Sequence, residues 1–273
     1  MAMNDEVKEQ RKKLKGKSFK EKLSYFWDYY KVHTLIALFV LLIVGIFVKD
    51  ELTAKDYAFY STLLNANAMD EQEGIQSDFA AFAGIDENVY DCSVDTSSTL
   101  SYETMSQIDL AVSQRIAAMS QTGGIDVLVS DQDPFTNFAT AGMFPDLRET
   151  LTTEEYEKFK NQFFYVDKAS MDINNNDTNY DEEGNLTVID TSIDHSDPSK
   201  MEDPVPVGIY VTDAPKLKEW KCYTGTDDGI VFGFVYSSER PDVSHQFLAF
   251  LYETEKAAAD TEQNDRASEK QDS

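Results

Sequence analysis

The 273-residue chain has few of the residues that most often carry catalysis, with three histidines and two cysteines. His33 begins an apolar stretch, His195 lies in an acidic stretch, and His245 lies among apolar residues at helical spacing. None of them belongs to a zinc-binding helix, a Cys-His pair or a nucleophile elbow, and the sequence has no Walker loop or glycine-rich dinucleotide fingerprint. These absences predict a protein that is not an enzyme.

Basic residues are scarce after residue 49. Residues 50–273 hold 14 Lys or Arg and 45 Asp or Glu, a net charge of −31. Because a phosphate backbone requires a basic surface, nucleic-acid binding is excluded for this part of the chain. An acidic surface instead suits solubility, cationic ligands or weakly held divalent ions. A solvated surface with no specific partner explains the same composition.

Cysteine is limited to Cys92 and Cys222, which are far apart in the sequence. They either form a disulfide on the oxidising side of a membrane or remain two buried, unreactive thiols, and the sequence leaves both alternatives open. No cysteine directly follows the apolar stretch of residues 32–48, which excludes a lipoprotein anchor.

One long uncharged stretch is present, VHTLIALFVLLIVGIFV, the 17 residues 32–48. As a helix it is about 25 Å long, near the lower limit for crossing a hydrocarbon core. Trp27, Tyr29 and Tyr30 precede it, where aromatic rings favour the headgroup region. We expect residues 32–48 to form a transmembrane helix.

Charge predicts how this helix is oriented. Residues 1–31 hold nine Lys or Arg against five acids, so they are expected to stay in the cytoplasm, with an extracellular domain at residues 55–256 of a single-pass cell-membrane protein. A cleaved signal peptide is the alternative. The roughly 30 residues before the apolar stretch are long for the first part of a signal peptide. The two positions where a cleavage site requires small residues are occupied by Leu52 and Ala54, and leucine is not small. A retained anchor is therefore expected.

Strands and helices are expected to alternate after the anchor, which is typical of βαβ units with parallel strands and predicts a three-layer α/β fold. The first expected strands are residues 57–64, 89–94 and 125–130. Apolar residues at helical spacing predict a helix between each pair of strands. The first helix contains Ile75, Phe79 and Phe82 and ends at Gly84, and the second contains Met105, Ile108, Val112, Ile116 and Met119 and ends at Gly123 and Gly124.

The second half of the chain is less regular. A short helix broken at Gly142 and Pro145 is expected first. Thr152 and Glu155 then form a capping box for a helix that ends near Phe163. A polar insertion or reduced second lobe is expected at 165–204, with a turn at 183–185. Two strands are expected at 205–211 and 229–236, and a helix is expected after Pro241 with Val243, Phe247, Phe250 and Leu251 on its apolar face. Residues 257–273 are expected to form a disordered tail.

Polar residues follow the predicted strands. In open α/β sheets, ligands bind beyond the carboxyl ends of the strands, where helix N-termini converge. Helix caps require the same residue types at the same places, so capping alone is the alternative interpretation. The candidate ligand-binding residues are Asn65, Asn67, Thr96, Ser97, Ser98, Ser130, Asp131, Asp133, Thr212, Asp213, Tyr236 and Ser237.

A weaker candidate is a calcium loop at residues 172–183. Asp172, Asn174, Asn176 and Glu183 occupy positions one, three, five and twelve of such a loop. Position six is Asp177, where the sharp turn requires glycine, so a solvated acidic loop is favoured over a calcium site. The expected cofactor is therefore none, with calcium as the alternative.

Two segments resemble the extracytoplasmic solute-binding proteins of bacterial transport systems, which have a type 2 periplasmic-binding-like fold of two α/β lobes. They are GIDVLVSDQDPFTNFATAGMFPDLRETL at 124–151 and GIVFGFVYSSERPDVSHQFLAFLYE at 229–253. The stretch FKEKLSYFWDYYKVHTLIALFVLLIVGIFV at 19–48 resembles the anchor of uncharacterised membrane proteins of Gram-positive bacteria. A full solute-binding protein devotes a whole lobe to the region between the first two segments, whereas here only residues 165–204 are available.

The resemblance implies a lobe like half of a periplasmic-binding protein. The implied function is capture of a small solute or an envelope component at the strand ends, with the anchor holding the domain near a membrane transport or sensing partner. The alternative is a non-catalytic interaction or scaffold domain that has kept the fold and lost the ligand.

Overall fold

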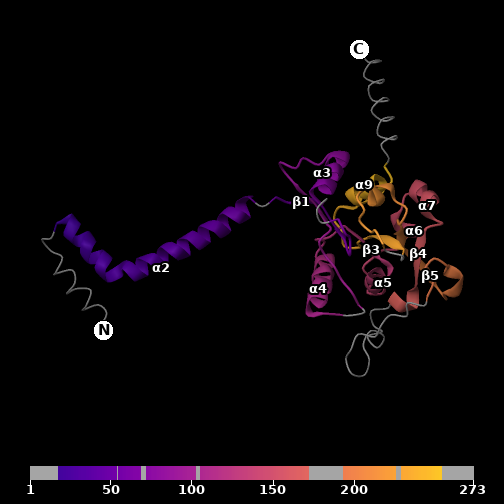
Figure 1. Cartoon of the computed structure of the whole chain (residues 1–273), viewed down its shortest axis with the longest axis horizontal. Coiled ribbons are helices and arrows are strands. Elements are labelled where there is room, and N and C mark those ends of the chain that lie inside the picture. The colour runs from indigo at the N-terminus through magenta and orange to yellow at the C-terminus, as the bar shows by residue number, and fades with distance from the viewer. Residues whose placement is uncertain are drawn as a thin grey trace, which may run out of the picture. The chain divides into compact units, whose positions relative to one another are not determined.

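The computed structural model describes residues 18–53, 55–68, 72–102, 105–171, 193–225 and 229–253 (Figure 1). The chain divides into two compact units, Met1–Lys55 and Asp56–Ser273. Several predicted features lie outside the described residues: the calcium ligands Asp172, Asn174, Asn176 and Glu183, the turn at 183–185 and the tail at 257–273.

The first unit contains one long helix, α2 (Phe19–Thr53), of 35 residues. Within it, Lys31–Lys49 has a mean hydropathy of 2.5, and none of this stretch is buried. Phe39, Leu41 and Phe47 are each more than 60% exposed. By length and composition this helix can cross a membrane, and a signal sequence has the same properties.

The second unit is a mixed α/β domain built on a six-stranded sheet of order β2-β1-β3-β6-β5-β4. β1 pairs in parallel with β2 and β3, and the pairs β3–β6, β6–β5 and β5–β4 are antiparallel. The strands are β1 (Tyr57–Leu63), β2 (Asp91–Asp95), β3 (Val127–Asp131), β4 (Phe163–Asp167), β5 (Pro204–Tyr210) and β6 (Ile230–Phe234). We call the end of the sheet where β1, β2 and β3 begin the amino edge, and the opposite end the carboxyl edge.

Helices cover both faces of this sheet, so the domain has three layers (Figure 1). Successive strand residues point to opposite faces, as Val127 and Leu128 of β3 do by packing into different cores. One face packs on α3 (Gln72–Ala83), α6 (Leu147–Thr150), α7 (Thr153–Phe159), α8 (Pro215–Glu219) and α9 (Pro241–Leu251). The other face packs on α4 (Gln107–Gln121) and α5 (Gln132–Thr140). Two short 3₁₀ turns, η2 (Lys168–Met171) and η3 (Pro198–Lys200), complete the described elements.

The core between the sheet and helices α4 and α5 depends on two strand glycines. Phe135 of α5 and Phe144 stack face to face, with ring centroids 4.3 Å apart and an interplanar angle of 6°. A Cβ added at Gly208 would lie 2.7 Å from the Phe135 ring, and one added at Gly233 would lie 2.7 Å from the Phe144 ring. The missing side chains on β5 and β6 therefore provide the space for the stacked pair.

Most of the predicted helix signals are confirmed by local geometry. Gly84, at φ +67°, follows α3 in the left-handed conformation. Thr152 and Glu155 form the predicted capping box at the start of α7. The apolar stripe on α4 is only partly confirmed, because Ile116 is buried whereas Ile108 is 73% exposed.

Two strand assignments differ from the sequence-based expectation. The expected helix through Phe163 ends earlier, since α7 stops at Phe159, and β4 (Phe163–Asp167) follows as an edge strand of the main sheet. Tyr165 is therefore part of this sheet rather than the start of an insertion. In addition, β6 runs antiparallel to β3, which a short apolar sequence cannot indicate, because strand direction leaves no trace in the hydrophobic pattern.

The two cysteines are free and buried in the structure. Both belong to the core beneath α3 and α9, and no disulfide joins them. Burial raises the pKa of each thiol to about 12. Of the two alternatives that the sequence left open, the structure shows the buried thiols.

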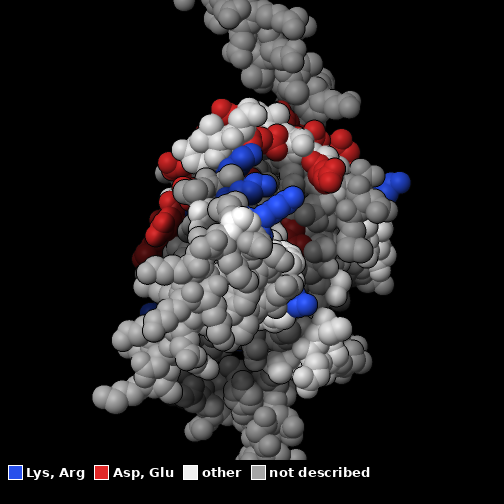
Figure 2. All heavy atoms as spheres, turned by 90° about the vertical axis from the view of Figure 1, so that its left-hand side faces the viewer, with Lys and Arg blue, Asp and Glu red and all other residues white. Residues whose placement is uncertain are grey.

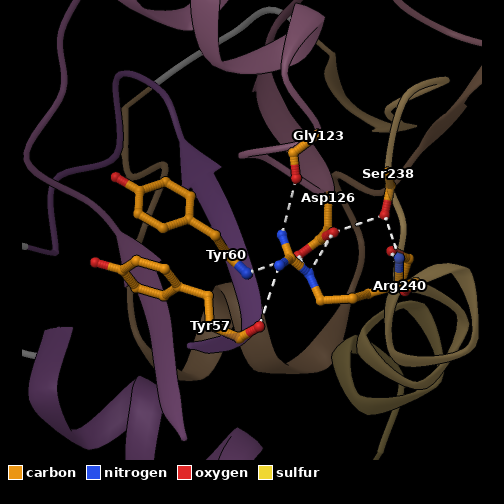
Figure 3. A network of polar contacts seen from close by, with 7 residues as sticks. Tyr57, Tyr60, Gly123, Asp126, Ser238 and Arg240 are labelled. Atoms are coloured by element: carbon orange, nitrogen blue, oxygen red, sulfur yellow. Dashed lines mark hydrogen bonds and ion pairs between the residues drawn. The ribbon is translucent and has the colours of Figure 1, made fainter. Parts of the chain in front are cut away.

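A buried ion pair fixes the start of α9 at the amino edge (Figure 3). The Arg240 Nε lies 3.0 Å from both carboxylate oxygens of Asp126, whose side chain is fully buried. The same guanidinium donates to the carbonyl oxygens of Tyr57 and Gly123, each at 3.1 Å. The Tyr60 amide and the Ser238 hydroxyl also donate to the Asp126 carboxylate, at 2.8 and 2.6 Å. Arg240 thus ties β1 and the start of β3 to α9.

Candidate functional site

The carboxyl edge gathers most of the candidate ligand-binding residues. Because β1, β2 and β3 are parallel, their ends bring Asn65, Thr96 and Asp131 to one side of the sheet. The direct evidence is a hydrogen bond of 2.8 Å from Asn65 Nδ2 to Asp131 Oδ1. Residues that are 66 positions apart in the sequence are therefore neighbours, as expected for the ends of parallel strands.

Asn65 is held in place by three hydrogen bonds. Its Nδ2 donates to the Leu100 carbonyl oxygen at 2.9 Å and to Asp131, and its Oδ1 accepts from the Leu100 amide at 2.7 Å. Its backbone is left-handed, at φ 62°, a conformation that asparagine tolerates better than most residues. The side chain thus fastens the loop after β2 to the ends of β1 and β3.

The serines after β2 contact a buried carboxylate. Ser97 and Ser98 donate their hydroxyls to Asp95 at 2.7 and 2.5 Å, and Arg115 of α4 reaches the same carboxylate at 3.1 Å. Burial alone would raise the pKa of Asp95, but the hydrogen bonds from Ser98, Ser97 and Arg115 outweigh it and lower that pKa. Asp95, the last residue of β2, therefore favours its ionised form.

The threonines and Ser130 also have partners inside the fold. Thr96 donates its hydroxyl to the Ala68 carbonyl oxygen at 3.2 Å, and Thr212 accepts from the Ile230 amide at 2.9 Å. Ser130 donates to the Asp131 carbonyl oxygen at 2.9 Å. These side chains brace the turns at the carboxyl edge, which is the role that the capping interpretation describes.

Two candidate acids lie at helix starts or on the surface. Asp133 lies in the first turn of α5. Asp213 is 92% exposed and contacts Lys218 at 2.6 Å.

Tyr236 and Ser237 lie at the amino edge, away from the other candidate residues. They follow β6, whose antiparallel direction takes its end to the place where β3 begins. Ser237 donates its hydroxyl to the carbonyl oxygen of Ser120, and Tyr236 is 77% exposed. The prediction that both share a site with Asn65 assumed a parallel strand and was wrong.

A groove of about 500 Å³ opens beside Asn67, between α3 and the end of α8. Asn67 itself is exposed, and its amide donates to the Cys222 carbonyl oxygen at 2.6 Å. The groove combines one amide, two carboxylates, one ammonium group and one indole wall. The lining residues are Asn67, Ala68, Gly74, Ile75, Asp78, Glu219, Trp220 and Lys221.

The α8 side of the groove is rigid. Trp220 packs on Phe250, and the Lys216 ammonium lies 5.8 Å from the indole centroid and 3.1 Å from Glu219. Lys221 adopts a left-handed backbone at φ 55°, which turns the chain at the rim of the groove. This wall was not predicted from the sequence, although Pro215 at the first position of α8 is a usable helix-start signal.

Metal binding finds no support among the residues that the structure describes, where no group of three or more His, Cys, Asp or Glu could hold an ion. The histidines of the α/β domain have other roles. His195 stacks on Phe164 with centroids 4.4 Å apart, and its Nδ1 lies 2.7 Å from the Tyr165 carbonyl oxygen. His245 of α9 contacts Glu155 of α7 at 2.9 Å, which joins two helices on one face of the sheet.

Figure 2 shows Asp and Glu side chains around the upper part of the view, with several Lys and Arg side chains between them.

No protein-family model matches this chain, and no curated protein does. A search of solved structures finds a likeness to iron-bound HitA from Pseudomonas aeruginosa, with a TM-score of 0.32 and 14% sequence identity. The match covers 72% of this chain and 82% of that one. At this level of similarity it identifies neither a ligand nor a family, so the function is argued from the chain's own residues.

Proposed function

We propose that this chain is a single-pass membrane protein whose acidic α/β domain lies outside the cell and binds a small solute or envelope component for a transport or sensing partner. In this proposal the domain is one lobe, like half of a solute-binding protein, and it acts by binding rather than catalysis. The observation that carries the proposal is the apolar stretch Lys31–Lys49, none of which is buried and which is long and apolar enough to cross a membrane, followed in the chain by an acidic domain with an open groove.

The charge distribution supports the orientation. Nine Lys or Arg lie before the apolar stretch, and an excess of basic residues favours the cytoplasmic side. With the basic segment in the cytoplasm, the domain that follows the helix, with its net charge of −31, would lie outside.

The groove supports a binding role. Its volume of about 500 Å³ falls within the range of small-molecule sites, roughly 300–1,000 Å³. Asp78 and Glu219 offer two carboxylates, and Lys221 offers one ammonium group. This lining suits a small ligand with a cationic or a zwitterionic group.

The binding test uses the full chain in nanodiscs and a library of small polar solutes, with melting temperature as the readout. A bound solute raises the melting temperature by an amount set by its concentration relative to its Kd. Asp78→Ala should abolish the shift, whereas Asp213→Ala, another exposed acid outside the groove, should retain it. A shift that survives Asp78→Ala would place the ligand elsewhere.

A second function, that of an interaction or scaffold domain without a ligand, is favoured by the polar groups at the carboxyl edge. Asn65, Asp95 and Thr212 are all engaged inside the fold. This alternative predicts no shift with any solute, and a chain that migrates in native membrane extracts as a complex larger than itself.

A further inference from the structure

The amino edge carries half of the exposed large apolar and aromatic side chains of the α/β domain. Of the eight such residues described after Lys55, four belong to this edge. Tyr57 opens β1, Val89 and Tyr90 precede β2, and Tyr236 follows β6. Their exposed fractions are 46%, 53%, 46% and 77%.

The length of the chain limits how far Tyr57, at this edge, can lie from the apolar stretch. Seven residues separate Lys49, the end of the apolar stretch, from Tyr57 at the start of β1. Even fully extended, seven residues reach only about 25 Å. Within the domain, the carboxyl edge lies one strand length from the amino edge, since the seven residues of β1 span about 23 Å.

The amino edge is also held rigidly. Tyr57 packs edge-on against Tyr60, with ring centroids 5.4 Å apart, and its carbonyl oxygen accepts from Arg240 (Figure 3). A tyrosine ring on a fixed backbone binds a surface at little entropic cost, because few torsions remain to be ordered.

The chemistry of this edge fits a lipid headgroup layer. Tyrosine favours the membrane interface, where its ring is shielded and its hydroxyl stays hydrated. Asp56, Glu87 and Asp91 belong to the same edge and disfavour both deep insertion and an anionic lipid surface. A zwitterionic headgroup layer is the partner that matches both features.

We propose that the amino edge, through Tyr57, Val89, Tyr90 and Tyr236, docks on the zwitterionic headgroup region of the bilayer that holds the helix. The carboxyl edge and the groove at Asn67 then face away from the membrane. This inference rests on the membrane anchorage proposed above, so anchorage is measured first.

The experiment reconstitutes the full chain in phosphatidylcholine nanodiscs that contain spin-labelled lipid, after attaching a fluorophore to a single introduced cysteine. Cys92 and Cys222 are buried and do not compete for the label. Tyr236→Cys probes the amino edge, and Thr212→Cys probes the carboxyl edge. A second pair carries Tyr57→Ser, Val89→Ser and Tyr90→Ser in addition, with circular dichroism confirming the fold.

Co-elution with the nanodisc shows anchorage, and a chain that elutes free contradicts the proposed function rather than the docking surface. With anchorage shown, the label at position 236 should be quenched several-fold more than the label at 212. The triple serine variant should lose most of that difference. Equal quenching at both positions, or quenching at 236 that the triple variant retains in full, would overturn the proposal.

Discussion

The guanidinium of Arg240 lies within 3.0 Å of both carboxylate oxygens of Asp126, 114 positions earlier in the sequence. Asp126 is fully buried and precedes β3, whereas Arg240 precedes α9. The sequence analysis read Asp126 only as part of an apolar strand, because nothing in the local pattern links it to a residue so far along the chain. This pair positions the amino edge on which the membrane-docking proposal depends.

Removing the Arg240 side chain should destabilise the domain strongly, because it leaves Asp126 as a buried charge without its cation. Arg240→Ala is expected to lower the free energy of unfolding by about 3 kcal/mol or more. Arg148→Ala is the matched control, since Arg148 pairs with Asp146 at the surface and should cost less than about 1 kcal/mol. Urea denaturation measures both, and equal losses would contradict the structural role of the pair.

Replacing Ser61 with alanine should stabilise the domain. Its hydroxyl is fully buried in β1 and has no hydrogen-bond partner among the described residues. Ser61→Ala should therefore raise the free energy of unfolding by about 1 kcal/mol. Ser244→Ala is the control, because that equally buried hydroxyl donates to the Arg240 carbonyl oxygen at 3.2 Å, and its removal should be destabilising. A loss of stability in Ser61→Ala would show an unrecognised partner.

Adding a side chain at a strand glycine should cause a steric clash in the core. Gly233→Ala places a methyl group 2.7 Å from the Phe144 ring, so we expect a loss of about 1–3 kcal/mol as the Phe135–Phe144 stack shifts. Gly74→Ala should instead be neutral or stabilising, since nothing lies within 4 Å of its added Cβ and alanine favours a helix. Thermal unfolding of the two variants compares them directly. Similar melting temperatures would refute the packing argument.

His195 gives the domain a pH dependence. Burial against Phe164 lowers its pKa below the unfolded value of about 6.5, although the Tyr165 carbonyl oxygen and Asp194 act in the opposite direction. His195 therefore binds a proton more readily in the unfolded state than in the folded state. The stability that the neutral, buried imidazole contributes is complete above about pH 6.5 and is lost as the pH falls below that value. Melting temperatures at pH 7.5 and 5.5 should differ less in His195→Asn than in the unsubstituted chain.

The two thiols should be inert in the folded chain. Burial raises the pKa of Cys92 and of Cys222 to about 12, so the reactive thiolate is almost absent at neutral pH. A thiol reagent should find no reactive group in the native protein and two after unfolding. Rapid reaction of either cysteine in the native chain would contradict this burial.

The sequence predicted the alternation of strands and helices well, because the apolar spacing around Phe79 and Ile116 and the stop signals at Gly84 and Gly123 are local. It missed β4 (Phe163–Asp167), which follows α7 after only three residues and without a turn signal. The sequence also did not reveal that β6 runs antiparallel to β3, so Tyr236 was assigned to the wrong edge.

Part of the arrangement at the carboxyl edge was predicted. The expectation of parallel strands correctly brought Asn65 and Asp131 together, since each lies at the end of one of two paired parallel strands, whereas their role in binding stays a prediction. Of the groove residues, only Asn67 was named in advance, because Trp220 and Lys221 reach it through tertiary packing of α8, which no short motif encodes.

The most direct test of the account is protease treatment of intact protoplasts that express the chain with an epitope after residue 273. We predict that the protease removes the epitope without lysis, while an N-terminal fragment containing residues 19–53 stays in the membrane fraction. An epitope that survives until the cells are lysed, or a mature chain released into the medium, would contradict a retained anchor with an external α/β domain.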